Sequence, residues 1–205
     1  MTKAEKTLRK NLEDAIIVLG SKFKIDNLEK LPSPDILVYD GRTQYRSDEN
    51  RLEFNKEQIS TPIVIGEEIS HYLHLQLNPI HKTALQDIFD ATRLVTTMET
   101  VGRYGALVYI NQKGIEIAPF SKQKGFSPDM SRYLTDDFSH NYGYKMAYKL
   151  MELHGDSMLP IVSRMSINDF IKALSRIAPS SWWAKNVTPK IDRITGYKPD
   201  LSLAE

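Results

Sequence analysis

The sequence predicts an α+β fold, with an N-terminal helix, a small antiparallel sheet and a mainly helical remainder. Apolar residues at helical spacing run from 3 to 24, and short segments of alternating apolar residues follow between 36 and 55. Helical patterns recur from there to about residue 179. A chain of 205 residues is long enough for one well-buried domain, and no internal repeat or low-complexity linker divides it, so we expect a single domain over 1–205.

The first segment, residues 3–24, has the pattern of an amphipathic helix, because its apolar side chains fall on one face. The two prolines of the following LPSPD, residues 31–35, exclude a helix and a central strand there, so we expect a loop. The apolar face of the helix consists of Leu8, Leu12, Ala15, Ile16 and Leu19.

Three short strands are predicted next. In ILVYDGRTQYR, residues 36–46, two strand-like runs flank Asp40 and Gly41, a pair that favours a hairpin turn. RLEFN, residues 51–55, alternates apolar and polar positions and predicts a third strand. The antiparallel sheet should therefore precede the next helix.

That helix has clear ends. Thr61 is a favourable N-cap residue, and Pro62 is suited to the first helical position. Asn78 followed by Pro79 predicts its C-terminal end.

A second long helix is predicted from about 80 to 103, since TRLVTTMETVGRYG, residues 92–105, finishes in glycines. ALVYI, residues 106–110, is either a strand or a continuation of this helix. Residues 111–137 carry glycine, proline, serine and charge, which predicts a long irregular connection.

The C-terminal part, residues 139–205, is expected to be mainly helical. One helix should span 139–154, and LPIVSRM, residues 159–165, should form a short helical piece. SINDFIKALSRIAP predicts a further helix with Ser166 as its cap and Pro179 after its end.

Composition excludes several classes of function. The net charge of +1 gives no electrostatic reason to expect a nucleic-acid or membrane partner. The absence of cysteine excludes a disulfide framework, thiol catalysis and any cysteine-based zinc site. No apolar run approaches transmembrane length, and no secretory h-region follows the charged start MTKAEKTLRK, so we expect a cytoplasmic protein.

The segment GEEISHYLH, residues 66–74, carries the chemistry. On a helix, Glu67, His71 and His74 fall within roughly 60° of one another, with Glu68 on the flank beside His71. The pattern differs from the H-E-x-x-H of zinc hydrolases only at Glu67, which stands at the position of the first histidine. Residues i and i+4 of that motif bind the metal, while the glutamate at i+1 takes a proton from water. This assigns Glu67 and His71 as ligands and Glu68 as general base.

A glutamate in the first ligand position has chemical consequences. A carboxylate oxygen binds zinc at about the same distance as an imidazole nitrogen. It adds negative charge, however, which weakens the acidification of a bound water and favours harder ions such as manganese or iron. We expect zinc; manganese, iron or no metal at all would also be compatible with the motif.

The simpler interpretation is a solvated helix face with ordinary i, i+3 contacts. Two observations oppose it. Three of the five histidines, His71, His74 and His81, cluster in this stretch. The helix is otherwise apolar, so its polar residues would be buried and would need partners or a ligand.

Residues 36–105 resemble the zincin-like metallopeptidases of the small gluzincin type. The resemblance lies in the strands, in the helix TPIVIGEEISHYLH and in the acidic residues of the next helix. It implies a sheet whose edge strand holds an extended peptide, a peptide or protein substrate, and a third ligand, usually Glu, from the following helix. Glu68 matches the general base of the family and His71 its second ligand, while Glu67 departs from its first.

The third ligand is open among several residues. Glu99 is favoured because it is the only glutamate of the second helix, just before a close-packing site at Gly102 and Gly105. It could instead form an i, i+4 ion pair with Arg103. Asp90, 19 positions after His71, has the spacing usual in the family.

His74 and His140 could also supply a ligand to the metal. His81 is expected outside the metal face, and His154 at a helix C-terminus. Tyr142 or Tyr144 could donate a hydrogen bond to an oxyanion, as some zincins use a tyrosine.

Two other functions compete with a metallopeptidase. The chain could keep a zincin-like scaffold without catalysis and act as a binding module, since Glu67 in place of histidine is the change that such a history would leave. A di-iron carboxylate protein would need a Glu-x-x-His from each of two helices, and only Glu68 to His71 fits. The sequence does not set the oligomeric state or the substrate.

Overall fold

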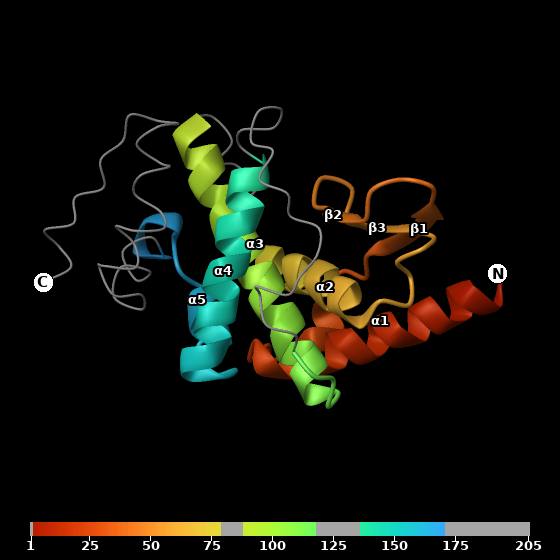
Figure 1. The fold of residues 1–205 in the computed structure, drawn as a ribbon. Coiled ribbons are helices and arrows are strands. Elements are labelled where there is room, and N and C mark those ends of the chain that lie inside the picture. The colour runs from red at the N-terminus through yellow and green to blue at the C-terminus, as the bar shows by residue number, and fades with distance from the viewer. Residues whose placement is uncertain (1, 79–87, 118–135, 171–205) are drawn as a thin grey trace, which may run out of the picture.

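A computed structural model describes residues 2–78, 88–117 and 136–170, with the backbone alone at 3, 88–93 and 136–142. It is α+β, with an N-terminal helix, a small sheet and a helical remainder, as predicted (Figure 1). The elements are α1 (Lys3–Lys22), η1 (Leu28–Lys30), β1 (Asp35–Tyr39), β2 (Gln44–Arg46), β3 (Arg51–Asn55), α2 (Pro62–Leu77), α3 (Ile88–Gln112), α4 (Asp136–His154) and α5 (Leu159–Val162).

The sheet is mixed, with strand order β1-β3-β2. β1 runs parallel to β3, and β2 runs antiparallel to β3. The predicted antiparallel sheet with a hairpin at Asp40 and Gly41 is therefore wrong, because β3 lies between the two strands that this turn connects. β3 takes the centre because Leu52, Glu53 and Phe54 are all buried, whereas no residue of β2 is.

α2 is the central helix of the molecule. It begins after Thr61 with Pro62 in its first turn and ends at Leu77, followed by the C-cap residue Asn78, whose N–H donates to the carbonyl of His74. These ends agree with the prediction, although the Thr61 side chain makes no capping hydrogen bond. Every residue from 65 to 75 is buried, which places α2 among neighbours on all sides. The acids and histidines of α2 are thus interior groups.

α3 extends past the glycines that were expected to end it. It includes residues 106–110, so ALVYI continues the helix and is not a strand. Gly102 and Gly105 do not break α3 because they lie where it packs most closely on α2. A Cβ at Gly105 would lie 2.0 Å from Ser70 Oγ, and one at Gly66 would lie 3.0 Å from the Cα of Ala106.

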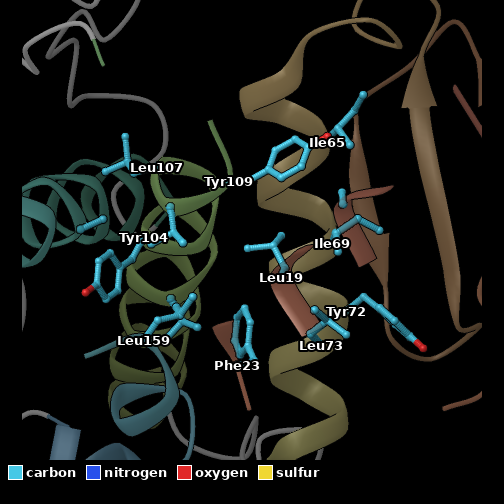
Figure 2. Packing of buried hydrophobic residues seen from close by; sticks show 14 of the residues in the cluster. Leu19, Phe23, Ile65, Ile69, Tyr72, Leu73, Tyr104, Leu107, Tyr109 and Leu159 are labelled. Atoms are coloured by element: carbon cyan, nitrogen blue, oxygen red, sulfur yellow. The ribbon is translucent and has the colours of Figure 1, made fainter. Parts of the chain in front are cut away.

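The hydrophobic core forms where α1, β3, α2, α3, α4 and α5 meet, and Figure 2 shows part of it. Each fully buried leucine or phenylalanine there contributes about 1.5–3 kcal/mol of burial free energy. The core therefore fixes α2 and α3 relative to each other. Prominent members are Leu19, Phe23, Ile65, Ile69, Leu73, Tyr104, Leu107 and Leu159.

The C-terminal helices are confirmed as far as residue 170. α4 begins at Asp136, a little before the expected start, and α5 falls within LPIVSRM. Ser166 accepts a hydrogen bond from the N–H of Asp169, as expected for an N-cap residue. The rest of that helix and of the part 139–205 lies outside the described residues. Within the described part of the chain, no helix is long and apolar enough to cross a bilayer.

The contact between Gly105 and Ser70 can be tested by a pair of substitutions. Gly105→Ala would place a Cβ 2.7 Å from Ser70 Cβ and should lower the free energy of unfolding by about 1–3 kcal/mol. In a Ser70→Gly background the overlap is gone, and alanine should then stabilise α3 by up to about 1 kcal/mol relative to glycine. Urea unfolding of the four proteins measures both effects. An equal loss in both backgrounds would contradict this packing.

Candidate metal centre

Three side chains with metal-binding atoms converge between α2 and α3. Glu67, His71 and Glu99 each offer an atom, and these atoms all lie within 4.8 Å of one another. His71 Nε2 and Glu99 Oε1 are 4.0 Å apart. This buried group could hold a metal ion. It combines the two ligands predicted on α2 with the favoured third candidate on α3.

Glycines allow these side chains to meet. A Cβ at Gly102 would lie 2.3 Å from Cε1 and 2.6 Å from Nε2 of His71, so the imidazole occupies the space that a side chain at 102 would fill. On the other side of α3, a Cβ at Gly143 of α4 would lie 2.6 Å from the Cβ of Glu99. The glycine-rich surfaces therefore determine how close His71 and Glu99 come.

The remaining candidate ligands do not join this group in the described part of the chain. His74, one turn further along α2, is fully buried and is not a member. Asp90 lies on α3 and His140 on α4, but their side chains are outside the described residues.

Four further residues singled out in the sequence fall in different places. His81 lies outside the described residues, as does the side chain of Tyr142. His154 is exposed at the end of α4, as expected. Tyr144 is buried and lines the same cleft as the metal-binding group.

Arg103 provides a cation beside the group. Its Nη2 donates to Glu67 Oε2 at 3.0 Å, and its guanidinium carbon lies 3.7 Å from the centre of the Tyr144 ring. By i, i+4 spacing, the expected partner of Arg103 was Glu99. The pairing with Glu67 depends on how α3 is rotated against α2, which local spacing does not determine. Glu67 Oε1 is buried and accepts no hydrogen bond from the described residues.

The carboxyl groups are strongly perturbed. Burial, and then the charge of Glu67, raises the pKa of Glu68 from 4.5 to about 8. Burial also raises the pKa of Glu99 well above its usual value, helped by the charges of Glu67 and Glu68. Carboxyl groups with raised pKa values in a cleft are typical of functional sites.

The group forms the floor of a cleft of about 830 Å³. Glu67, Glu68, His71 and Glu99 line its inner surface, and residues 41–45, which lead into the edge strand β2, line its rim. A cleft of this size suits a small molecule or a short stretch of peptide. No sequence pattern indicated that Arg42 would lie at this rim, since only the fold brings residues 41–45 beside α2.

No protein-family model, curated protein or solved structure matches this chain. The resemblance to the zincin-like peptidases therefore stays a prediction.

The raised pKa of Glu68 predicts how stability depends on pH. Between pH 5 and about 8 the folded protein keeps a proton that the unfolded chain releases, so the free energy of unfolding should fall as the pH rises through this interval. At about 1.4 kcal/mol for each pKa unit, the fall should amount to a few kcal/mol. Urea unfolding of chelator-treated protein measures it.

Glu68→Gln should make this dependence shallower, because glutamine does not titrate, while the contribution of Glu99, whose pKa is also raised, should remain. Glu57→Gln, at an exposed position, is the matched control and should leave the wild-type slope unchanged. Parallel curves for wild type and Glu68→Gln would show that Glu68 ionises normally.

Proposed function

We propose that this protein is a metal-dependent, zincin-like hydrolase that acts on peptides, in which Glu67, His71 and Glu99 bind a divalent ion and Glu68 is the general base. The main support is the convergence of the three ligand atoms within 4.8 Å, beside Glu68, in one cleft. Nothing in the ordinary packing of two helices requires four such polar groups in the interior.

The residues fit an ion chemically. Glu67 uses Oε2 for Arg103 and keeps the buried Oε1 for another contact. When ionised, the three carboxylates of the site outweigh the two guanidinium groups of the cleft, those of Arg42 and Arg103, and a bound cation would offset the remaining negative charge. Three protein ligands with an open position are typical of catalytic zinc sites, and the two carboxylates also favour manganese or iron.

Glu68 is suited to move a proton. A bound ion would polarise a substrate carbonyl and make a water more acidic. Without an ion, Glu68 keeps its proton at neutral pH, because its pKa is raised to about 8. The positive charge of a bound ion would lower this pKa, and the ionised carboxylate could then accept a proton from that water and pass it to the leaving amine. Burial and the charge of Glu67 raise the pKa of Tyr144, so its hydroxyl stays protonated and can donate to a developing oxyanion.

The position of the edge strand β2 beside the cleft supports a peptide substrate. Among the strands of the described residues, β2 pairs with β3 and lies at the edge of the sheet, and Gln44 and Tyr45 of β2 line the cleft. An extended peptide could add to the side of β2 away from β3 by main-chain hydrogen bonds, beside the metal-binding group.

A binding module without catalysis is the second candidate, and the Arg103–Glu67 ion pair favours it. The guanidinium balances Glu67 without any ion. In this case Glu68 and Glu99 would hold protons, as their raised pKa values allow. The di-iron function has less support, because no second Glu-x-x-His exists in the sequence.

Metal content separates the two candidates. Purified wild-type protein should contain about one zinc, manganese or iron ion per chain, and His71→Ala should lose it because a ligand is removed. His154→Ala, at an exposed position, is the matched control and should keep it. Inductively coupled plasma mass spectrometry gives the content. If the wild-type protein takes up no ion, even with zinc, manganese or iron in excess, the metal-dependent hydrolase is excluded and the binding module without catalysis remains.

Glu68→Gln separates binding from catalysis. The variant should keep the metal and cleave a peptide mixture at least about 100-fold more slowly than wild type, since it lacks the general base. Mass spectrometry of the cleaved peptides, with metal content measured in parallel, tests this. Equal cleavage rates in the two metal-loaded proteins would refute the role of Glu68.

A further inference from the structure

β1 is one edge of the three-stranded sheet, and its outer side meets no other strand among the described residues. The N–H of Asp35 donates to the carbonyl of Asn50, at the start of the pairing with β3. In a strand, the N–H and C=O groups of successive residues point to opposite sides. Every second residue from Asp35 onward therefore bonds to β3, while Ile36 and Val38 direct their N–H and C=O groups to the open side.

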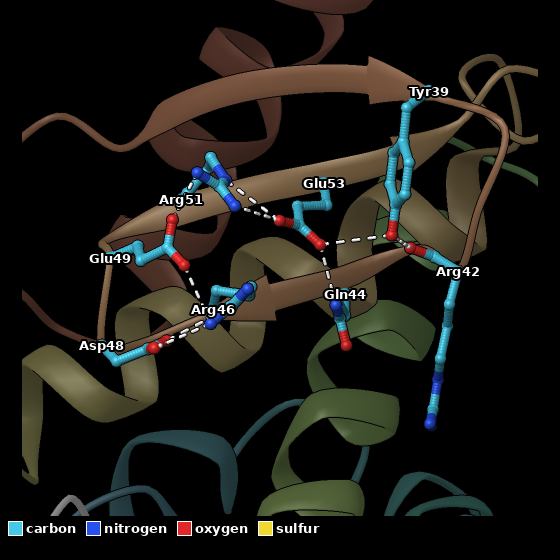
Figure 3. Close-up of polar contacts among 8 residues, drawn as sticks. All are labelled: Tyr39, Arg42, Gln44, Arg46, Asp48, Glu49, Arg51 and Glu53. Carbon is cyan, nitrogen blue, oxygen red and sulfur yellow. Dashed lines mark hydrogen bonds and ion pairs between the residues drawn. The ribbon is translucent and has the colours of Figure 1, made fainter.

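The two edges of the sheet differ in their protection. On β2, Arg46 pairs with Asp48 and Glu49, within the polar network that Figure 3 shows. Among the residues drawn there, β1 contributes Tyr39 alone. The centre of β1 is Leu37, which is 39% exposed, and the strand has no lysine, arginine, proline or bulge. These are the features that keep edge strands apart, so β1 is a template for pairing with another strand.

A hollow of about 180 Å³ lies beside this edge, between β1 and α1. Because side chains alternate along a strand, Ile36 and Val38 point to this face of the sheet and Leu37 points to the other. All three side chains leave apolar surface uncovered, since none of them is buried. A further strand beside β1 would cover this surface on both faces. The hollow is lined by Glu5, Leu8, Arg9, Ile36 and Val38.

We infer that β1 is a dimerisation edge, at which two copies of the chain join their sheets by antiparallel β1–β1 pairing. The residues fit a two-fold axis at Leu37. Ile36 of each copy then lies opposite Val38 of the other, and each such pair exchanges two main-chain hydrogen bonds. The two Leu37 residues form the non-hydrogen-bonded pair between them, in which side chains are closest. Ile36 and Val38 of each copy extend the apolar surface beside the hollow of the other.

The charges at this edge suit a second copy as the partner. A two-fold interface brings the same surface of both copies together, so an unbalanced charge there would repel itself. Asp35 is the only charged residue of β1. In this register the two Asp35 residues are four positions apart along the junction, about 13 Å, which exceeds the screening length at physiological salt. Glu5 and Arg9, beside the hollow, have opposite charges, and the whole chain has a net charge of only +1.

Cysteine cross-linking tests the register, because the chain has no cysteine of its own. In Leu37→Cys, the Cα atoms of the two cysteines should lie about 4.5 Å apart, a separation that a disulfide spans. Mild oxidation should therefore convert this variant to covalent dimers, as measured by non-reducing electrophoresis. Asp35→Cys is the matched control, exposed on the same face of the same strand. Its two cysteines should lie about 13 Å apart and should link at least about tenfold more slowly.

Sedimentation tests the same contact without a covalent bond. The wild-type protein should change from monomer to dimer as its concentration rises from about 10 to 500 μM, since a short strand pair forms a small interface. Leu37→Lys places two positive charges at the axis and should raise the dissociation constant at least about tenfold. Ile17→Lys makes the same change at an apolar residue of α1 that is 66% exposed, and should leave the dissociation constant unchanged. Amide exchange at Ile36 and Val38 should slow as the dimer forms.

The outcomes decide between this contact and others. A wild-type protein that stays monomeric up to about 500 μM would overturn the inference and leave the edge to a strand of another protein. Equal linking of Leu37→Cys and Asp35→Cys, or a dimer that Leu37→Lys does not weaken, would place the contact on another surface. No residue of β1 lines the cleft, so the inference goes beyond the proposed function, and a protein that dimerises without binding metal would reject the hydrolase alone.

Discussion

The close approach of α2 and α3 is the constraint on which the rest of the structure depends. Side chains normally hold two packed helices 8–10 Å apart. Here Gly66, Gly102 and Gly105 remove them along the shared face, and the imidazole of His71 lies in the space beside Gly102. This contact brings Glu99 to the acids of α2. The metal-binding group is thus a product of helix packing as much as of the sequence motif.

The same packing buries charge, and the site must balance it. A buried carboxylate without a partner costs several kcal/mol, so it attracts a cation or a proton. Arg103 forms an ion pair with Glu67, while burial raises the pKa values of Glu68 and Glu99 and so favours their protonated forms. An ion bound in the group would replace these protons. Stability and metal binding are therefore linked through the same carboxylates.

The parts of the site that lie within one helix could be predicted from sequence, because i, i+4 spacing fixes them. This holds for Glu67 and His71, and Glu99 followed as the only glutamate of the next helix. The strand order could not be predicted, since the burial of β3 on both faces, and not the turn after β1, decides which strand is central. The glycines of α3 looked like helix ends, because local propensity does not register a packing contact.

The space beside Gly102 also links two positions in evolution. Glycine inside a helix is about 1 kcal/mol less stable than alanine, so α3 carries this cost while the imidazole at 71 needs the room. A descendant that replaced His71 by a small residue would be free to place alanine at 102 and would gain stability. Substitutions at 71 and 102 should therefore occur together. A lineage that has lost the metal-binding group should have a small residue at 71 and a side chain, such as that of alanine, at 102.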